Sequence, residues 1–235
     1  MPSTQTALQK ISENLEAVKA KIMATSTDVG RNPESVNLVA VSKTHEIDHI
    51  RPALVAGHRI FGENRVQEAA EKWPILREEF PDLQLHLIGP LQSNKVKKAI
   101  GLFDVIETVD RPKLARALAR EMADLSRRPS CFIQVNTGEE EQKAGVKPSQ
   151  VDEFITLCRD ELDLPIIGLM CIPPQGEEPG MHFGLLAEMA KRNNLTGLSM
   201  GMSSDFETAV RFGATHVRVG TAIFGTRPPF RPAGE

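Results

Sequence analysis

Short apolar runs alternate with longer amphipathic stretches along most of the chain. Residues 4–25 come first, and their apolar positions recur at helical spacing among charges, which predicts an amphipathic helix: Leu8, Ile11, Leu15, Val18 and Ile22. Eight later apolar runs have the length of buried strands: 36–43, 59–64, 85–89, 105–109, 131–136, 166–172, 197–203 and 216–220. Helical patterns lie between or after them: 46–56, 66–80, 94–102, 112–125, 148–162, 181–192, 205–212 and a short one from about 221.

Regular alternation of strand and helix predicts a parallel sheet. Eight strands in 235 residues, with no separate block of composition, favour a closed (β/α)8 TIM barrel over an open doubly wound sheet. We therefore predict an α/β fold in three parts. Residues 1–30 form a helix packed on the outside, residues 31–228 form the barrel, and residues 229–235 form a Pro-rich tail.

Composition and charge indicate which kinds of partner and site to expect. The formal net charge is −3 and the pI is about 6.1, so no general basic field predicts a nucleic-acid or membrane partner. Cys131, Cys158 and Cys171 are widely spaced, which favours reduced, buried thiols over disulfides or metal ligands, and we predict no metal site. The chain shows no secretory signal pattern and no membrane-spanning run. We expect a cytoplasmic monomer.

Lys43 follows the apolar run 38–41 and ends the first predicted strand. Burying an ammonium group inside a barrel costs free energy, so a lysine at this position requires a structural or functional explanation. It could be a salt-bridged structural residue, a phosphate-binding charge, or a nucleophile that forms a Schiff base. The last role needs a neutral amine, which partial burial beside another cation favours. Arg218, on the strand that closes against the first, could be that cation, or it could pair with a barrel carboxylate such as Glu63.

Two neighbouring loops carry matched phosphate-binding chemistry. Ser203 and Ser204 precede the seventh helix, and Gly220 and Thr221 follow the last strand. Phosphates in TIM barrels often bind at the loops after strands seven and eight. Taken singly, the serines could be helix caps and Gly220 a simple turn; together, the two loops favour a phosphate site.

Several motifs occur in order between about residues 38 and 225: "AVSKTH", "FGENRVQEA", "HLIGPLQSNK", "GLMCIPP" and "LSMGMSSDFETAVRFGATHVRVGTAIFG". With these motifs the chain resembles the pyridoxal phosphate homeostasis protein family, the YggS/PROSC type. That family is similar to the barrel domain of alanine racemase, a fold-type III barrel, standing alone. The N-terminal helix and the Pro-rich tail contribute little to the resemblance.

The resemblance implies a cofactor, pyridoxal 5′-phosphate (PLP), and roles for specific residues. Lys43 would hold PLP as a Schiff base, and Arg218 would face the pyridine nitrogen. Four residues would hold the phosphate, and two more would line the pocket: Ser203, the backbone of Ser204, Gly220 and Thr221, then Asn64 and Met200.

Arginine cannot accept a proton, so at this position it would leave the pyridine nitrogen unprotonated and the cofactor a poorer electron sink. The chain has no tyrosine, the residue that serves as the second base in alanine racemases, although His86 or His45 could substitute. We therefore predict PLP storage or delivery in vitamin B6 homeostasis, with PLP-dependent enzymes as possible clients and without evident catalysis. An amino-acid racemase and a Schiff-base aldolase acting on a sugar phosphate are the enzyme alternatives.

Overall fold

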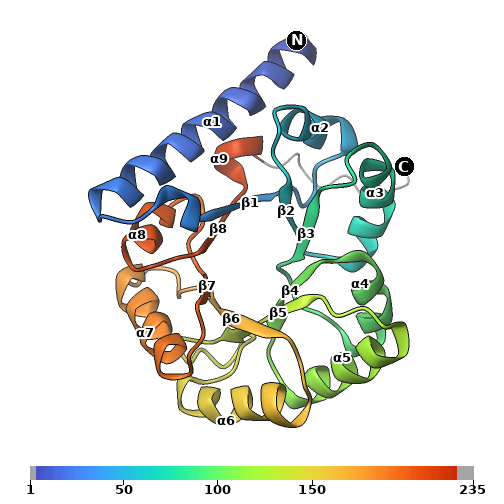
Figure 1. Ribbon diagram of the computed structural model, residues 1–235. Helices are drawn as coiled ribbons and strands as arrows, with labels where there is room; N and C mark the ends of the chain where they lie inside the picture. The colour runs from blue at the N-terminus through green and yellow to red at the C-terminus, as the bar shows by residue number, and fades with distance from the viewer. Residues whose placement is uncertain (1–3, 227–235) are drawn as a thin grey trace.

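A computed structural model describes residues 4–226, with side chains from residue 9 onward. Within these residues, eight parallel strands form a closed barrel in chain order, ringed by helices (Figure 1). The predicted (β/α)8 barrel is confirmed. The strands are β1 (Asn37–Val41), β2 (Ile60–Glu63), β3 (Gln84–Leu87), β4 (Val105–Val109), β5 (Ser130–Val135), β6 (Ile166–Cys171), β7 (Gly197–Ser199) and β8 (His216–Val219).

The helices follow the predicted amphipathic stretches, with short 3₁₀ turns before two of them. They are α1 (Thr4–Asp28), α2 (Ile47–Val55), α3 (Val66–Glu79), α4 (Val96–Leu102), α5 (Pro112–Leu125), α6 (Val151–Thr156), α7 (Pro179–Arg192), α8 (Phe206–Arg211) and α9 (Thr221–Phe224). The single helix predicted over 148–162 is instead a 3₁₀ turn at Pro148–Gln150, α6, and a π-helical turn at Leu157–Glu161.

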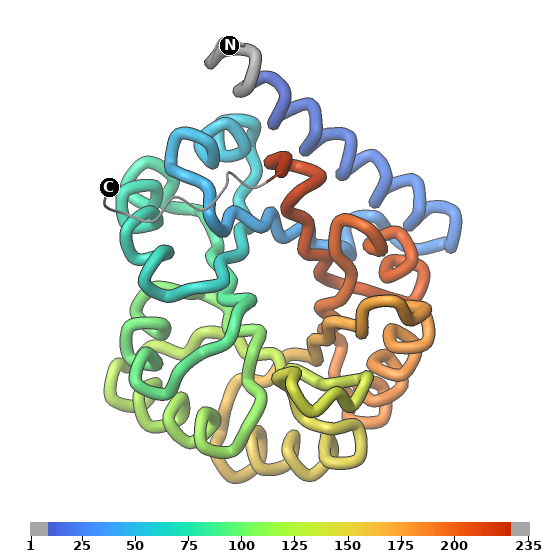
Figure 2. The backbone as a smooth tube through the Cα atoms, turned by 180° about the vertical axis from the view of Figure 1, so that it is seen from behind, coloured from blue at the N-terminus to red at the C-terminus, as the bar shows by residue number. Residues whose placement is uncertain are grey.

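Helix α1 lies along the outside of the barrel, beside α8 and α9 (Figures 1 and 2). It buries one face there, through Ile11, Leu15, Val18 and Ile22. Asn14 also donates a hydrogen bond of 2.9 Å to the carbonyl of Ile223 in α9. The predicted outer helix is therefore present. The division of the chain at residue 30 stays a prediction, and the predicted Pro-rich tail lies outside the described residues.

Side chains alternate between the helical layer and the barrel interior, as the two-residue period of a strand requires. In β8, Val217 and Val219 join the large apolar cluster between strands and helices, whereas Arg218 faces inward, as predicted. A separate small cluster fills part of the interior: Val105, Phe132 and Met170.

One predicted strand end is wrong by four residues. β7 stops at Ser199, although the sequence pattern extended it to residue 203. Gly201 has a φ of 91°, a backbone conformation that breaks an extended strand and that glycine adopts without strain. Ser203 and Ser204 consequently lie in the loop before α8.

Among residues 4–226, the helices are too short or too polar to cross a lipid bilayer. The same residues contain no group of three or more histidine, cysteine or acidic side chains placed to hold a metal ion. The three cysteines are buried and unpaired, and burial raises the pKa of the Cys158 and Cys171 thiols to about 12.

A matched pair of glycine substitutions tests the barrel packing. A Cβ at Gly168 in β6 would lie 2.2 Å from the carbonyl oxygen of Gly197 in β7, so we expect Gly168→Ala to lower the free energy of unfolding by about 2 kcal/mol or more. Gly101 in α4 has open space around it, so Gly101→Ala should raise that free energy by about 0.5 kcal/mol. Urea unfolding measures both; equal effects would contradict this packing.

Stability should fall in mild acid because the fold disfavours the protonated form of two histidines, His58 and His216. Burial lowers the pKa of His58 and of His216 to about 4, so the folded protein keeps both neutral while the unfolded chain binds protons below about pH 6.5. Each histidine should therefore remove up to roughly 3 kcal/mol as the pH falls from about 6.5 to about 4.

The substitution His58→Gln keeps a donor for the carbonyl of Ile60 and removes the titrating ring. We expect the variant to lose less stability than the wild type between about pH 7 and about pH 5 in urea unfolding. An unchanged pH dependence would contradict this assignment.

Candidate functional site

A cavity of about 370 Å³ lies at the carboxyl ends of the strands. Seven of the eight residues predicted for the site line it: Lys43, Asn64, Ser203, Ser204, Arg218, Gly220 and Thr221. These residues come from the loops after β1, β2 and β7, from β8, and from Gly220 and Thr221 at the start of α9. The barrel therefore brings together residues that lie up to 178 positions apart in the sequence.

Lys43 lies two residues beyond the end of β1. Val41 lines the cavity, and the alternation of the strand continues that inward direction to Lys43. The loop 42–45 then turns sharply, with Thr44 in the left-handed region at a φ of 67°. The amide of His45 closes the turn by donating to the carbonyl of Ser42 at 3.2 Å.

Arg218 is 4% exposed and lies inside the barrel. Its Nη1 donates to Ser199 Oγ at 2.6 Å, and its Nη2 donates to the carbonyl of Cys171 at 2.9 Å. Nη1 also lies 3.9 Å from Glu107 Oε2. The carboxylate that balances Arg218 is therefore Glu107. Glu63, the partner that we considered from the sequence, pairs with Lys72 instead, because Glu63 faces the helical layer.

A hydrogen-bonded chain holds Glu107 in place behind Arg218. Its Oε1 lies 2.7 Å from His86 Nδ1, and its Oε2 accepts from Ser199 Oγ at 2.6 Å. Burial alone would raise the pKa of Glu107, but the hydrogen bond from His86 and the charge of Arg218 lower it to about 2. The guanidinium therefore has an ionised partner at neutral pH and a fixed direction.

The segments after β7 and β8 carry the predicted phosphate-binding groups of the cavity. The backbone N–H of Ala222, at the start of α9, lies 3.5 Å from Ser203 Oγ, which brings the two loops together. At Gly220 a Cβ would meet the Cβ and carbonyl oxygen of Val41 at 3.2 Å, so a larger residue would crowd β1. Hydroxyls and backbone N–H groups at Ser203, Ser204 and Thr221 form a donor set suited to an anion.

Met200 does not line the cavity. It is fully buried within the large cluster between strands and helices, whereas Ser199 faces the barrel interior. The alternation of β7 thus directs Met200 outward, and Met202 takes the place in the cavity wall that we expected for Met200. The structure does not bring Met200 into the cavity, and its role at the cofactor stays a prediction.

The sequence interpretation missed other wall residues: Ile88, Gly89, Pro90, Gln134, Ala144 and Ile172. Gln134 had a detectable signal, since it is a polar residue in the middle of an apolar strand, two positions after the inward-facing Phe132. The others lie in loops, where no periodicity indicates a direction.

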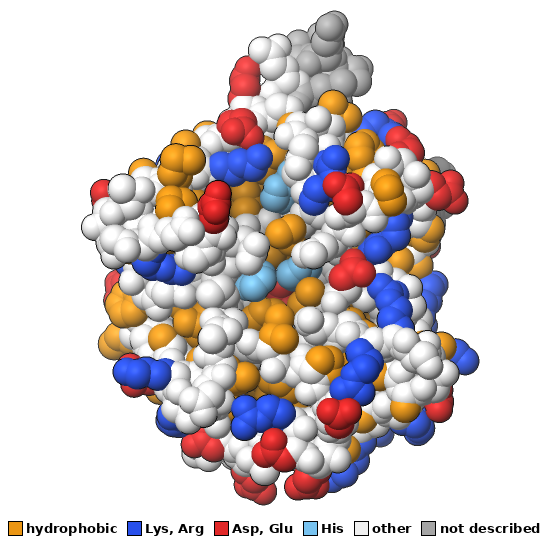
Figure 3. Space-filling model, in the orientation of Figure 1, with side chains coloured by type: hydrophobic (Ala, Val, Ile, Leu, Met, Phe, Trp, Pro, Cys, Tyr) orange, Lys and Arg blue, Asp and Glu red, His pale blue; other side chains and the backbone are white. Residues whose placement is uncertain are grey.

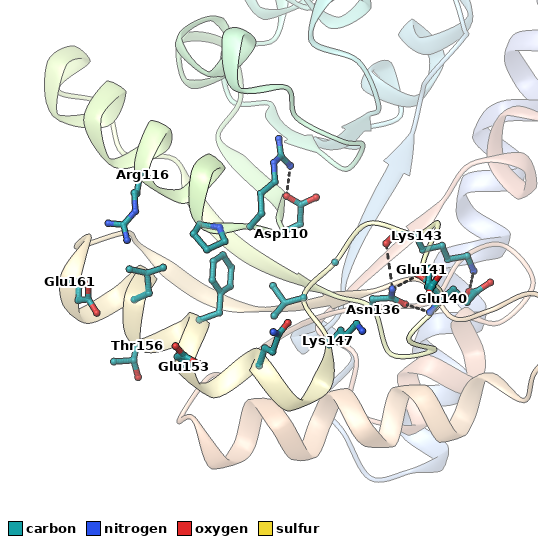
Figure 4. Close-up of a pocket in the computed structure, with 17 residues that line it drawn as sticks. Asp110, Arg116, Asn136, Glu140, Glu141, Lys143, Lys147, Glu153, Thr156 and Glu161 are labelled. Atoms are coloured by element: carbon teal, nitrogen blue, oxygen red, sulfur yellow. Dashed lines mark hydrogen bonds and ion pairs between the residues drawn. The ribbon is translucent and has the colours of Figure 1, made fainter.

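A second and larger cavity, of about 910 Å³, lies between α5, α6 and the loop after β5 (Figure 4). Lys143, on the loop after β5, lines this cavity and forms an ion pair with Glu140. Neither Lys143 nor Lys95 lines the cavity that contains Lys43. Figure 4 shows Lys143 on the loop, away from Arg116 and Glu161 across the cavity.

The two histidines considered as racemase bases do not line the cavity with Lys43. His86 is buried against Glu107, and its ring centroid lies 5.8 Å from that of His216. His45 stacks on His49, with ring centroids 4.7 Å apart. Figure 3 shows histidine side chains near the centre of this face of the barrel, with an acidic side chain beside them and apolar groups around them.

Taken together, the wall offers an amine, a buried guanidinium and a cluster of anion-binding donors within one cavity. A phosphorylated aldehyde with a ring nitrogen has the complementary groups: a carbonyl carbon for the amine, an acceptor for the guanidinium and a phosphate for the hydroxyl and N–H donors. The residues present therefore fit PLP.

Comparisons with known proteins agree on the family. Residues 7–228 match the family model described as alanine racemase, N-terminal domain. The chain is 39% identical over 236 residues to the pyridoxal phosphate homeostasis protein of Vibrio cholerae, covering 96% of this chain and 100% of the relative.

Solved structures give the same result. PipY of Synechococcus elongatus, solved with PLP bound, is 41% identical, with a TM-score of 0.78 and coverage of 92% of this chain and 100% of PipY. An alanine racemase of Clostridium difficile shares the fold at 14% identity, with a TM-score of 0.72 over 94% of this chain and 57% of the racemase. The chain belongs to the family of the pyridoxal phosphate homeostasis proteins, built on the alanine racemase N-terminal domain.

Proposed function

We propose that the protein binds PLP and serves intracellular vitamin B6 homeostasis, holding the cofactor as a Schiff base on Lys43. The observation that carries this proposal is the cavity that joins Lys43, Arg218 and the Ser203–Thr221 donor groups. The names of the relatives and the PLP-bound structure of PipY support it. Lys43 would supply the amine for this linkage to the PLP aldehyde, and one water molecule would leave.

Four residues hold the phosphate in this proposal: Ser203, Ser204, Gly220 and Thr221. Arg218 donates to the pyridine nitrogen, and Asn64 contacts the ring. Arg218 transfers no proton to the nitrogen, because a guanidinium keeps its protons at physiological pH and the ionised Glu107 further stabilises its charge. The ring then stays a weak electron sink, so the site stores the cofactor better than it uses it.

The racemase alternative lacks support. Alanine racemases share the fold alone at the identities found, and the chain contains no tyrosine. We propose further that the protein acts in the cytoplasm, which suits its unpaired thiols, as a monomer that passes PLP to client enzymes.

The absorbance spectrum tests the linkage. With added PLP, we expect the wild type to develop the visible absorbance band of a protonated Schiff base. The Lys43→Ala variant should show no such band from this site. Lys191→Ala, in the last turn of α7, is the matched control and should keep the band. A wild-type spectrum equal to that of free PLP would contradict the proposal and leave Lys43 as a phosphate-binding or aldolase residue.

Deuterium exchange at the α-carbon of an amino acid distinguishes PLP storage from racemisation. We expect no solvent deuterium at the α-carbon of L-alanine or D-alanine after long incubation with the PLP-loaded protein, because the cavity wall offers no tyrosine or histidine as a second base. Mass spectrometry measures the incorporation. Exchange that is lost in Lys43→Ala would favour the racemase alternative.

A further inference from the structure

Lys72 is a buried lysine that the proposed cofactor chemistry does not use. It lies on the inner face of α3, 6% exposed, next to the buried Trp73. Burying an ammonium costs free energy unless charges and acceptors surround it. The acceptors that surround the Lys72 ammonium therefore indicate what this buried charge does.

Two carboxylates and two carbonyl oxygens surround the Lys72 ammonium. Its Nζ lies 2.8 Å from Glu63 Oε1 and 2.8 Å from Glu68 Oε1. It also donates to the carbonyl of Ser42 at 3.3 Å and to that of His45 at 3.1 Å. These two carbonyls lie on either side of Lys43 and Thr44, so one ammonium holds both ends of the loop that carries Lys43.

The two carboxylates contact the same loop. Glu68 Oε1 accepts from the backbone N–H of Thr44 at 2.5 Å, and Glu63 Oε1 accepts from Ser42 Oγ at 2.8 Å. Thr44 has a φ of 67°, a conformation that costs of order 1 kcal/mol for a residue other than glycine and persists only when its surroundings impose it. The cluster of Lys72, Glu63 and Glu68 imposes it here.

We propose that Lys72, with Glu63 and Glu68, is a positioning residue for Lys43: the cluster fixes the 42–45 loop so that the Lys43 amine is presented to the cavity. Lys72 itself does not contact the cofactor, since it does not line the cavity. This inference rests on the proposed function. An ion pair that only stabilised α3 would have no need of contacts to both ends of this loop.

Glu68→Ala is the informative variant. Glu68 is partly exposed, so its removal leaves no fully buried charge alone, whereas Lys72→Met leaves the buried Glu63 without its cation. Glu71→Ala, an exposed position on the same helix, is the matched control. Trp73 is the single tryptophan of the chain and donates to Glu63 Oε1 at 3.1 Å, so its fluorescence reports whether each variant keeps the fold around Glu63.

Two ligands distinguish a displaced Lys43 from a cavity that is damaged as a whole. PLP can react with Lys43, whereas pyridoxamine 5′-phosphate has an amine in place of the aldehyde and can only bind. In Glu68→Ala we expect Schiff-base formation, followed by absorbance, to slow at least about tenfold, because a displaced nucleophile loses its productive geometry. The dissociation constant for pyridoxamine 5′-phosphate, from calorimetry, should stay within about twofold.

Glu71→Ala should change neither quantity, and Glu68→Gln, which keeps an oxygen acceptor for Thr44, should recover most of the rate. A wild-type rate in Glu68→Ala would overturn the inference, and so would a parallel loss of affinity for both ligands. A wild type that forms no Schiff base would overturn the proposed function, and this inference with it.

Discussion

The pairing of β8 with β1 is the interaction on which the site depends. Asn37 pairs with His216 and Ala40 with Val219, so the strand that precedes Lys43 and the strand that carries Arg218 run side by side. An open sheet would leave these strands at opposite edges. Closure places the Lys43 amine, the guanidinium and the loop at Gly220 and Thr221 around one cavity.

Closure also buries charge, and the chain balances that charge on both sides of the barrel wall. Inside, Glu107 faces Arg218 and shares Ser199 with it. Outside, Glu63 pairs with Lys72 beneath the loop 42–45. Buried ion pairs add little to stability compared with apolar packing. The inner pair orients Arg218, and we propose that the outer pair orients the loop that carries Lys43.

The sequence predicted the fold and most of the cavity because periodicity and chain order determine both. Strand ends were right to within two residues apart from β7, where Gly201 ends the strand early. β7 directs Met200 outward, and the turn at Gly201 beyond the strand breaks the alternation, so Met202 occupies the place expected for Met200. The partner of Arg218 was not predictable, since only the three-dimensional structure decides between Glu107 and Glu63. Lys72 gave a faint signal, as a lysine on the apolar face of α3 beside Ala69, Trp73 and Leu76.

Reduction of the PLP-loaded protein with borohydride, followed by peptide mass mapping, tests the central claim most directly. The reagent makes an imine permanent and thereby marks the lysine that carries the cofactor. We expect the pyridoxyl mass on the peptide that contains Lys43, with none on those of Lys72, Lys95 or Lys143 at one equivalent of PLP. A mark mainly on another lysine, or no mark at all, would contradict the claim that the closed barrel presents Lys43 to the cofactor.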